Sequence, residues 1–402
     1  MCKHPINVEV DLFKVKKKYR LADFFDMHWD EYMKSPTEYV KPEQLKAVNA
    51  MRVCRTAVLG KRTYGCPDCG EITEVYHSCK NRFCPTCSWK DTMKWAERIQ
   101  GRMLKTKHRH IVCTLPHSLH PLIKRNEQTL LGSLMRASAA TFKDWFENKH
   151  RLKIGVILVL HTYGEKKDYH PHVHMIVSWG GVDIKTEELK EIKEEYINYK
   201  FLQKKFRCKF EDELVELNDK GELAHGFTHR KEFMEYIKQV NQKDWQLHLE
   251  PSIETPVKVI RYIGRYSKRA CLSEYKITEI DKEYISFSYK DYRDRDENQK
   301  PKEKELRLHY REFFPRLLQH VPAKYFRIVR YYGLYSNHGN IPEEYFYTEE
   351  EKTEEPEEPE IDVSYCAHCK VQKVLINIYF DARPKKERTA YKTGKYKKKQ
   401  AA

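Results

Sequence analysis

The pattern of apolar and polar residues predicts a β-hairpin near the middle of the chain. The segment IGVILVL, at 154–160, is dense in β-branched and aliphatic residues and is typical of a buried strand. A polar turn, GEKKDY, separates it from a second apolar run, HVHMIVSW. Alternate side chains of a strand share a face, so His170, His172 and His174 are expected to project together. The apolar residues between these histidines would anchor the strand on its other face.

This hairpin is a candidate metal site. His161 lies on the first strand, where it could supply a third imidazole across the strand pair. A His-x-His pair alone is a weak signal, because nineteen histidines in 402 residues give about one such pair by chance. Histidines that bind no metal are therefore the alternative, and the rest of the chain has to decide between the two.

Similar patterns predict the other elements. Apolar residues at helical spacing predict helices within 1–60, 88–108, 118–150 and 186–208. Short apolar or alternating runs predict strands at 109–116 and 244–251, the second of them at a sheet edge.

A further helix is predicted in the segment ETPVKVIRYIGRYSKR. Thr255 is a good N-cap and Pro256 suits the first helical turn. Tyr262 and Tyr266 are four residues apart, so both phenols leave the same side of this helix. The alternative is a pair of interface tyrosines, since 27 tyrosines give about two such pairs by chance. A phenol can attack a DNA phosphodiester when a cation polarises the phosphoryl oxygens, which gives the tyrosines a role beside the histidines.

The cysteines supply the strongest local signal. Cys66 and Cys69 form one Cys-x-x-C turn, and Cys84 and Cys87 form a second one after 14 intervening residues. Two such turns at this spacing predict a zinc ribbon, in which four thiolates complete a tetrahedron around a structural Zn²⁺. A redox-active pair, the alternative, would need one turn only.

The remaining cysteines leave several assignments open. Cys79 and His77 are surplus to the four and could bind a second metal or replace one of the ligands. Cys54 is interpreted as a core thiol rather than a ligand. Cys366 and Cys369 form a third Cys-x-x-C, which could be half of another zinc site with Cys54 and Cys79 as partners.

The charge of the chain favours a polyanionic partner. The total is +16, and ten Glu against one Lys at 343–360 put −9 in one segment, which leaves +25 on the rest. Such a surplus, with 27 tyrosines, is typical of nucleic-acid binding, although a basic ribosomal or membrane-surface protein would also fit. Lys80 and Arg82, between the cysteines, are expected at the surface, where phosphates could reach them. A basic tail, KKERTAYKTGKYKKKQ, follows the acidic segment.

The sequence shows no apolar run of membrane length and no signal-peptide core. We therefore expect a cytoplasmic protein without a membrane partner. In that compartment its cysteines are expected to be thiols and metal ligands rather than disulfides.

Taken in order, these motifs resemble a known family. The segments CRTAVLG, YHSCKNRFCPTC, HIVCTLPHSL, HTYG, HPHVH, YIGRYSKR and FRIVRYYGLYSN each resemble segments of the rolling-circle transposases of the IS-ninety-one (IS91) type, in the HUH superfamily. The resemblance extends over most of the chain. The acidic segment and the basic tail depart from the family's pattern, and the third Cys-x-x-C lies between them.

The resemblance implies roles for the residues in these motifs. His172 and His174 would bind a catalytic Mg²⁺ or Mn²⁺, with His161 as a less secure third ligand because other members use a different one. Tyr262 and Tyr266 would be the nucleophiles of a two-tyrosine enzyme. The implied partners are single-stranded transposon ends and target DNA, and further expected DNA contacts come from three basic residues of the tyrosine helix, Arg265, Lys268 and Arg269.

The implied fold is α+β. A central antiparallel sheet flanked by helices would carry the histidines on a middle strand, behind a helical and zinc-ribbon-like N-terminal domain. The expected divisions are an N-terminal domain at 1–104, a catalytic domain at 105–340, an acidic linker at 341–362 and a C-terminal segment at 363–402. A plasmid replication initiator or relaxase of the same superfamily, or a non-catalytic zinc-dependent DNA-binding protein, are the alternatives.

Overall fold

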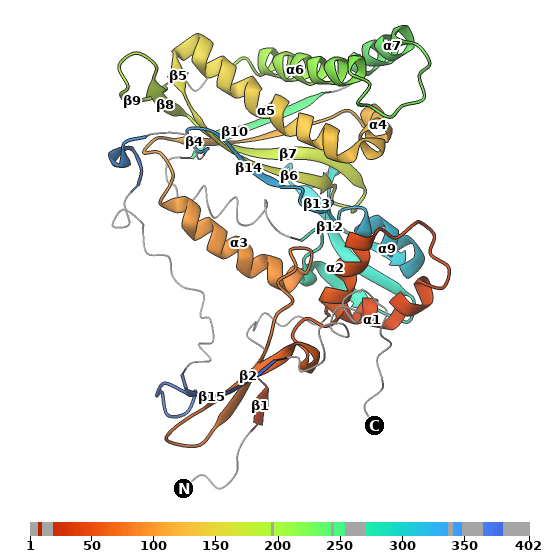
Figure 1. Ribbon diagram of the computed structural model, residues 1–402, viewed down its shortest axis with the longest axis vertical. Helices are drawn as coiled ribbons and strands as arrows, with labels where there is room; N and C mark the ends of the chain where they lie inside the picture. The colour runs from red at the N-terminus through yellow and green to blue at the C-terminus, as the bar shows by residue number, and fades with distance from the viewer. Residues whose placement is uncertain are drawn as a thin grey trace.

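A five-stranded antiparallel sheet forms the centre of the computed structural model, which describes residues 7–9, 19–193, 197–242, 245–253, 270–336, 341–347 and 365–380. The strand order is β10-β4-β7-β6-β14, and the sheet lies in the upper half of the view in Figure 1. The strands are β4 (His108–Thr114), β6 (Gly155–Tyr163), β7 (Tyr169–Ser178), β10 (Gln246–Ile253) and β14 (Val329–Gly333). The predicted strands at 109–116 and 244–251 are thus confirmed within a few residues, and β10 lies at the sheet edge.

The predicted hairpin is confirmed as the pair β6 and β7. Its register sets His161 directly opposite His172. β7 is the middle strand of the five, and its Val173 and Met175 are completely buried in the main core. The odd-numbered residues of β7 therefore hold the strand in place, while the even-numbered histidines belong to the other face.

Helices cover both faces of this sheet (Figure 1). One face carries α4 (His120–Arg125), α5 (Glu127–His150), α6 (Tyr199–Asp219) and α7 (Arg230–Asn241), with the short helix η2 (His117–Leu119) before them. α3 (Pro85–Gln100) runs along the opposite face. The expected antiparallel sheet flanked by helices is therefore present.

The predicted helix at 186–208 is wrong in its first half. Residues 189–191 form β9 (Leu189–Glu191), which pairs with β8 (Gly180–Asp183), and β8 also pairs with β5 (Leu152–Lys153). α6 then begins at Tyr199. The backbones of β8 and β9 come close together at Gly180, where a Cβ would lie 2.5 Å from the carbonyl oxygen of Lys190. Close backbone approach at glycine makes this strand pairing available, and it outweighs the helical propensity of the Glu- and Lys-rich segment.

A second core joins the N-terminal helices to a late part of the chain. It brings together α1 (Leu21–Tyr32), α2 (Pro42–Arg52), η3 (Glu274–Lys276), β11 (Ile277–Ile280), β12 (Tyr284–Arg295), β13 (Pro301–His309) and α9 (Tyr310–Leu318). Phe25 of α1 stacks on Phe314 of α9, with ring centroids 4.4 Å apart. The helices predicted before residue 60 therefore pack on residues that follow the central sheet in sequence.

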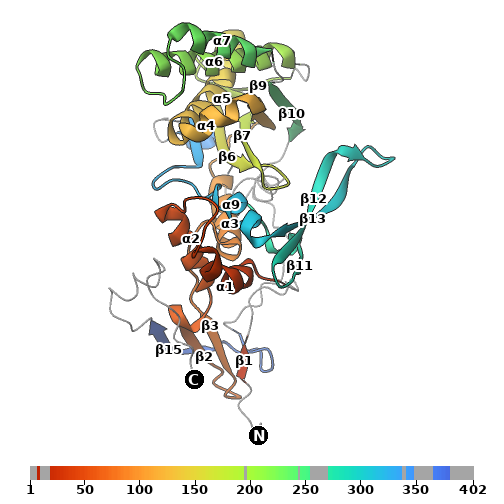
Figure 2. The same ribbon diagram turned by 90° about the vertical axis from the view of Figure 1, so that its right-hand side faces the viewer.

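The cysteine module, residues 54–87, carries a small sheet of its own. Its strand order is β1-β3-β2-β15, with β1 (Asn7–Glu9), β2 (Gly60–Gly65), β3 (Ile72–Tyr76) and β15 (Val374–Phe380), and the short helix η1 (Ala57–Leu59) precedes β2. The N-terminal β1 and the C-terminal β15 thus lie on either side of one hairpin. Figure 2 shows this sheet at the end of the molecule opposite α6 and α7.

Some predicted features lie outside the described residues. These are the tyrosine helix, which falls within 254–269, the acidic residues from 348 onward and the basic tail at 381–402. The start of the acidic segment holds η4 (Glu343–Tyr345). Among the residues that the structure describes, no helix is both long enough and apolar enough to cross a membrane.

Candidate functional site

Three histidines of the β6–β7 hairpin converge on one face of the central sheet. Each of His161, His172 and His174 offers a ring nitrogen, and these nitrogens all lie within 4.8 Å of one another. The Nε2 atoms of His172 and His174 are 3.1 Å apart. The ring centroid of His161 is 4.5 Å from that of His174. The structure thus brings together the three imidazoles that the sequence suggested.

His170, the other histidine of this strand, is not one of the three, although its ring centroid lies 5.3 Å from that of His172. Its ring centroid lies 5.8 Å from that of His120 and 6.0 Å from that of His117. Its backbone carbonyl lies 2.7 Å from Nδ1 of His172. This hydrogen bond places the Nδ1 proton on His172 and leaves Nε2 with a free lone pair that can face an ion.

The histidine face of the sheet is the one covered by α3. Ile157, Val159 and Ile176 share this face by strand alternation, and they pack against Trp95 and Ile99 of α3. The apolar contact ends where the histidines begin. The strands are therefore held rigidly by packing on both faces up to the site, which suits ligands that must keep a fixed geometry.

Burial keeps the paired histidines neutral. The pKa values of His172 and His174 lie well below the ordinary value of 6.5, chiefly because burial disfavours the charged ring and secondly because of His161 beside them. Neutral imidazole is the form that binds metal ions. Three such nitrogens can hold one divalent ion and leave coordination positions for water and a phosphate oxygen.

A fourth histidine, which the sequence analysis did not select, supports this group from the neighbouring strand. Nε2 of His110, on β4, lies 2.9 Å from Nδ1 of His174. On its other side, Nδ1 of His110 lies 3.4 Å from a carboxylate oxygen of Glu250 on β10. The imidazole of His110 therefore lies between the carboxylate of Glu250 and the ring of His174. The motif HRHIVCT contains His110, but only the strand register shows which histidine it meets.

A cavity of about 270 Å³ lies beside His161. Arg82, Arg327 and Ala270, the first described residue after the tyrosine segment, line it together with the carboxylates of Asp91 and Glu127. Arg82 is exposed and donates a hydrogen bond to the carbonyl of Phe326. The cavity beside His161 is thus lined by groups of both charges, and its two arginines could contact a phosphodiester.

Of the other residues predicted to contact or cleave DNA, the structure describes Lys80 but not those of the tyrosine segment. Lys80 is exposed, as expected, in a left-handed turn with φ of 52°. The two nucleophile candidates, Tyr262 and Tyr266, and the basic residues beside them, Arg265, Lys268 and Arg269, lie outside the described residues.

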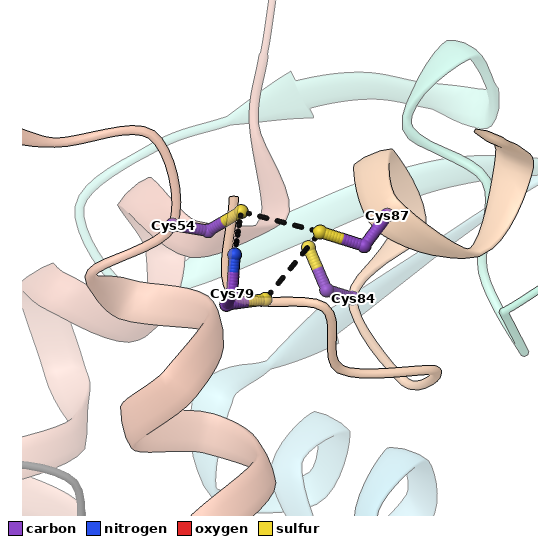
Figure 3. Close-up of side chains that lie close together, drawn as sticks. All are labelled: Cys54, Cys79, Cys84 and Cys87. Atoms are coloured by element: carbon purple, nitrogen blue, oxygen red, sulfur yellow. Dashed lines mark hydrogen bonds between the residues drawn. The ribbon is translucent and has the colours of Figure 1, made fainter. Parts of the chain in front are cut away.

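Four cysteines meet at the base of the cysteine module (Figure 3). They are Cys54, Cys79, Cys84 and Cys87, whose sulfurs all lie within 4.8 Å of one another. Sγ of Cys87 is 3.5 Å from Sγ of both Cys54 and Cys79, and all four thiols are free of disulfides. A tetrahedron with Zn–S bonds of about 2.3 Å has sulfurs about 3.8 Å apart. The spacing therefore fits structural zinc.

The predicted grouping of Cys66, Cys69, Cys84 and Cys87 in one ribbon is wrong. Cys66 and Cys69 form the turn of the β2–β3 hairpin, whereas the other two lie beyond its base. β3 has five residues, which span about 17 Å at 3.3 Å per residue. The intervening residues thus separate the two Cys-x-x-C turns.

This separation revises three other assignments. Cys54 is a member of the first cluster rather than an isolated core thiol, and Cys79 takes the place expected of Cys66 or Cys69. His77 is not in the cluster, since its Nε2 lies 3.2 Å from the carbonyl of Tyr379.

The C-terminal cysteines complete a second cluster. Cys366 and Cys369 lie with Cys66 and Cys69, again with all four sulfurs within 4.8 Å of one another. The sequence analysis gave Cys366 and Cys369 the wrong partners, because Cys54 and Cys79 belong to the first cluster.

Comparison with known proteins identifies the family. Residues 155–342 match a family described as "Putative transposase", and residues 24–115 match a family described as "Transposase zinc-binding domain". The chain is 28% identical over 302 residues to the transposase for insertion sequence element IS801 of Pseudomonas savastanoi pv. phaseolicola, covering 73% of this chain and 70% of that protein. It belongs to the IS91-type transposases.

A second relative of this transposase is "Putative transposase y4qJ" of Sinorhizobium fredii, which is 29% identical over 325 residues, or 79% of this chain and 80% of that protein. No solved structure matches the chain. The matched spans contain the three histidines and the whole first cysteine cluster. Cys366 and Cys369 lie outside both spans.

Proposed function

We propose that this transposase is an HUH-type endonuclease that nicks single-stranded transposon ends and transfers the cut strand to target DNA in a rolling-circle-like reaction. The observation that carries the proposal is the convergence of His161, His172 and His174 within 4.8 Å on one face of the central sheet. Three convergent imidazoles suit phosphoryl chemistry better than simple DNA binding.

The proposed reaction is a pair of transesterifications. The phenolic oxygen of Tyr262 or Tyr266 attacks the scissile phosphorus, the bond from phosphorus to the 3′ oxygen breaks, and the phenolic proton is lost. The products are a 5′-phosphotyrosine and a 3′-hydroxyl, which receives a proton. A divalent ion at the histidines, Mg²⁺ or Mn²⁺, would polarise the phosphoryl oxygens, although imidazole would also accept Zn²⁺ or Co²⁺.

The second transesterification regenerates the tyrosine. A 3′-hydroxyl attacks the phosphotyrosine, a new phosphodiester forms, and the phenolate takes back a proton. With two tyrosines, one can hold a 5′ end while the other cleaves a second junction.

Other residues of the chain bind and orient the DNA. Arg82 and Arg327 border the cavity beside His161, where they can neutralise charge that develops on the phosphate. Arg265 lies between the two tyrosines in sequence, Lys268 and Arg269 follow them, and all three are proposed to hold the same strand. Lys80 is exposed on the cysteine module and suits a contact with the DNA backbone farther from the scissile phosphate. The site of action would be the nucleoid of a prokaryotic cytoplasm.

A covalent-adduct assay tests this function. Purified protein, Mn²⁺ and fluorescent single-stranded DNA carrying the element's ends should give a protein–DNA adduct that survives denaturing electrophoresis. The same ends as a duplex should give far less. Binding without any adduct would instead support the non-catalytic DNA-binding alternative.

The replication-initiator and relaxase alternatives share this chemistry, so the adduct does not separate them. They differ in outcome, since only a transposase joins the element's end to unrelated target DNA. The relatives named above favour the transposase.

A further inference from the structure

The Cys-x-x-C turns at Cys66 and Cys366 have the same backbone structure. In both turns the N–H of the first cysteine donates to the carbonyl five residues later, at 2.9 and 2.8 Å. The carbonyl of the first cysteine accepts from the N–H four residues later, at 3.0 Å in each turn. The residue after the second cysteine is left-handed in both, with φ of 72° at Gly70 and 58° at Lys370. A lysine adopts this conformation at a cost of about 1 kcal/mol, so the turn is held by other interactions.

The sulfurs of these two turns face each other. Sγ of Cys69 lies 3.7 Å from Sγ of Cys366, close to the tetrahedral spacing, and no disulfide joins them. We infer that Cys66, Cys69, Cys366 and Cys369 hold a second structural zinc ion, which fastens the C-terminal segment to the cysteine module. Four thiolates in tetrahedral array select zinc, with iron as the chemical competitor.

A buried lysine and a glutamate lie beside the second cluster. Nζ of Lys373 lies 3.3 Å from a carboxylate oxygen of Glu71. The same carboxylate oxygen lies 2.9 Å from Sγ of Cys366. Metal binding removes the thiol proton of Cys366 and would leave two anions in contact, and the ammonium of Lys373 offsets part of their charge.

Strand pairing alone is a weak attachment for this segment. β15 pairs with β2 at the sheet edge, yet all seven of its side chains are exposed. Without burial, the hydrophobic effect contributes little, and an isolated edge strand is marginal in water. A structural zinc site supplies free energy that does not depend on a core. The metal is therefore what holds the C-terminal segment in place.

The attachment also fixes the start of the basic tail. Residues 381–402 hold nine Lys and Arg against two acidic residues and follow β15 directly. The second zinc site thereby keeps β15, the strand that precedes this positive segment, at the cysteine module, although Cys366 lies 297 positions after Cys69 in sequence.

Metal analysis of the full chain tests the inference. Elemental analysis of the purified protein for zinc and iron should find two zinc ions per chain. The variant Cys366→Ser, Cys369→Ser should retain one, and Cys208→Ser, which removes a cysteine outside both clusters, should retain two. One zinc in the unmodified protein, iron in place of zinc, or an unchanged count in the double variant would overturn the second site.

A cleavage experiment tests the attachment itself. A specific protease site is inserted between Thr353 and Glu354, the chain is cut, and the products are separated by size under native conditions. The C-terminal fragment should stay with the body of the protein and should leave after zinc chelation or in the Cys366→Ser, Cys369→Ser variant. Release without chelation, or retention in that variant, would contradict a zinc clasp. Both readouts are independent of DNA cleavage, so the proposed enzymatic function can fail without affecting them.

Discussion

Nε2 of His110 lies 2.9 Å from Nδ1 of His174, and this contact crosses from one strand of the central sheet to the next. Glu250 stands behind His110 on the edge strand β10. A histidine that binds a metal through one nitrogen is commonly oriented by a hydrogen bond at its other nitrogen. The row from Glu250 through His110 is therefore expected to fix the ring of His174 in its ligand orientation.

The first prediction concerns this positioning role. His110→Ala is expected to weaken Mn²⁺ binding about 10- to 100-fold, because the support of a metal ligand is lost while the ligand itself remains. Calorimetric titration of Mn²⁺ measures the change directly. His248→Ala, which removes an exposed histidine from β10, is the matched control and should bind Mn²⁺ normally. Equal affinity in the two variants would exclude the role of His110.

The second prediction concerns the proposed metal ligands His161, His172 and His174. His172→Ala or His174→Ala should abolish nicking of single-stranded ends and leave DNA binding nearly unchanged, since most affinity comes from contacts with phosphates. His161→Ala tests the third ligand by its Mn²⁺ dependence. His170→Ala is the control on the same strand and should nick DNA. Nicking by the His172 and His174 variants in the presence of a chelator would rule out the metal role.

The third prediction concerns the nucleophiles, Tyr262 and Tyr266. Each single change to Phe should spare folding, because only a hydroxyl is lost, and should block complete transposition. The double change should leave no covalent DNA adduct. Peptide mass spectrometry of the adduct identifies the attacking residue. Full transposition by either single variant would refute a scheme with two nucleophiles.

The fourth prediction concerns the first cysteine cluster. Cys84→Ser should remove one zinc ion and unfold the surrounding module, because metal binding supplies the folding energy there, about 10 kcal/mol or more in small zinc domains. Zinc content and thermal unfolding measure the loss. Cys113→Ser, which alters a buried cysteine outside both clusters, should keep all zinc even if it lowers stability. Unchanged zinc content in Cys84→Ser would disprove the site.

The fifth prediction concerns acid stability. Burial lowers the pKa of His108 from 6.5 to about 3, and its Nε2 lies 2.6 Å from the hydroxyl of Tyr335. Below pH 6.5 the unfolded chain takes up a proton that the folded chain refuses. The stability that neutral His108 contributes is therefore complete above pH 6.5 and is lost as the pH falls toward 3, by up to about 1.4 kcal/mol per pH unit.

Urea unfolding at pH 7 and pH 5 measures this dependence. His108→Gln should reduce the difference in unfolding free energy between the two pH values, whatever its effect on stability at pH 7. An identical difference in both proteins would show that His108 does not titrate as described.

The sequence predicted the site better than it predicted the metal module. Alternation on β7 and a short turn set His161 opposite His172, because a hairpin is a local structure whose register follows from neighbouring residues. The support from His110 was out of reach, since it depends on the pairing of β4 with β7 across more than 60 residues. The cysteine spacing predicted the wrong groups of zinc ligands for a related reason. Four thiols form a cluster wherever the chain brings them, and the partners of Cys66 lie 300 residues away at Cys366.

The helix predicted at 186–208 failed at its start, although the contact that decided it is local. Its Glu- and Lys-rich composition favours a helix, but residues 189–191 pair as a strand with the backbone from Gly180 to Val182. The composition of that segment does not indicate a strand, whereas the apolar alternation of β7 does.

The sequence separation of Cys69 and Cys366 also determines when the second zinc site can form during translation. The two cysteines are separated by 297 positions, and a ribosome adding 5 to 20 residues per second needs about 15 to 60 s to cover that distance. Throughout this interval the first pair of thiols is already outside the ribosome without its partners. A chain that stops before Cys366 never closes this site, so only a transposase translated beyond Cys369 can be fully metallated.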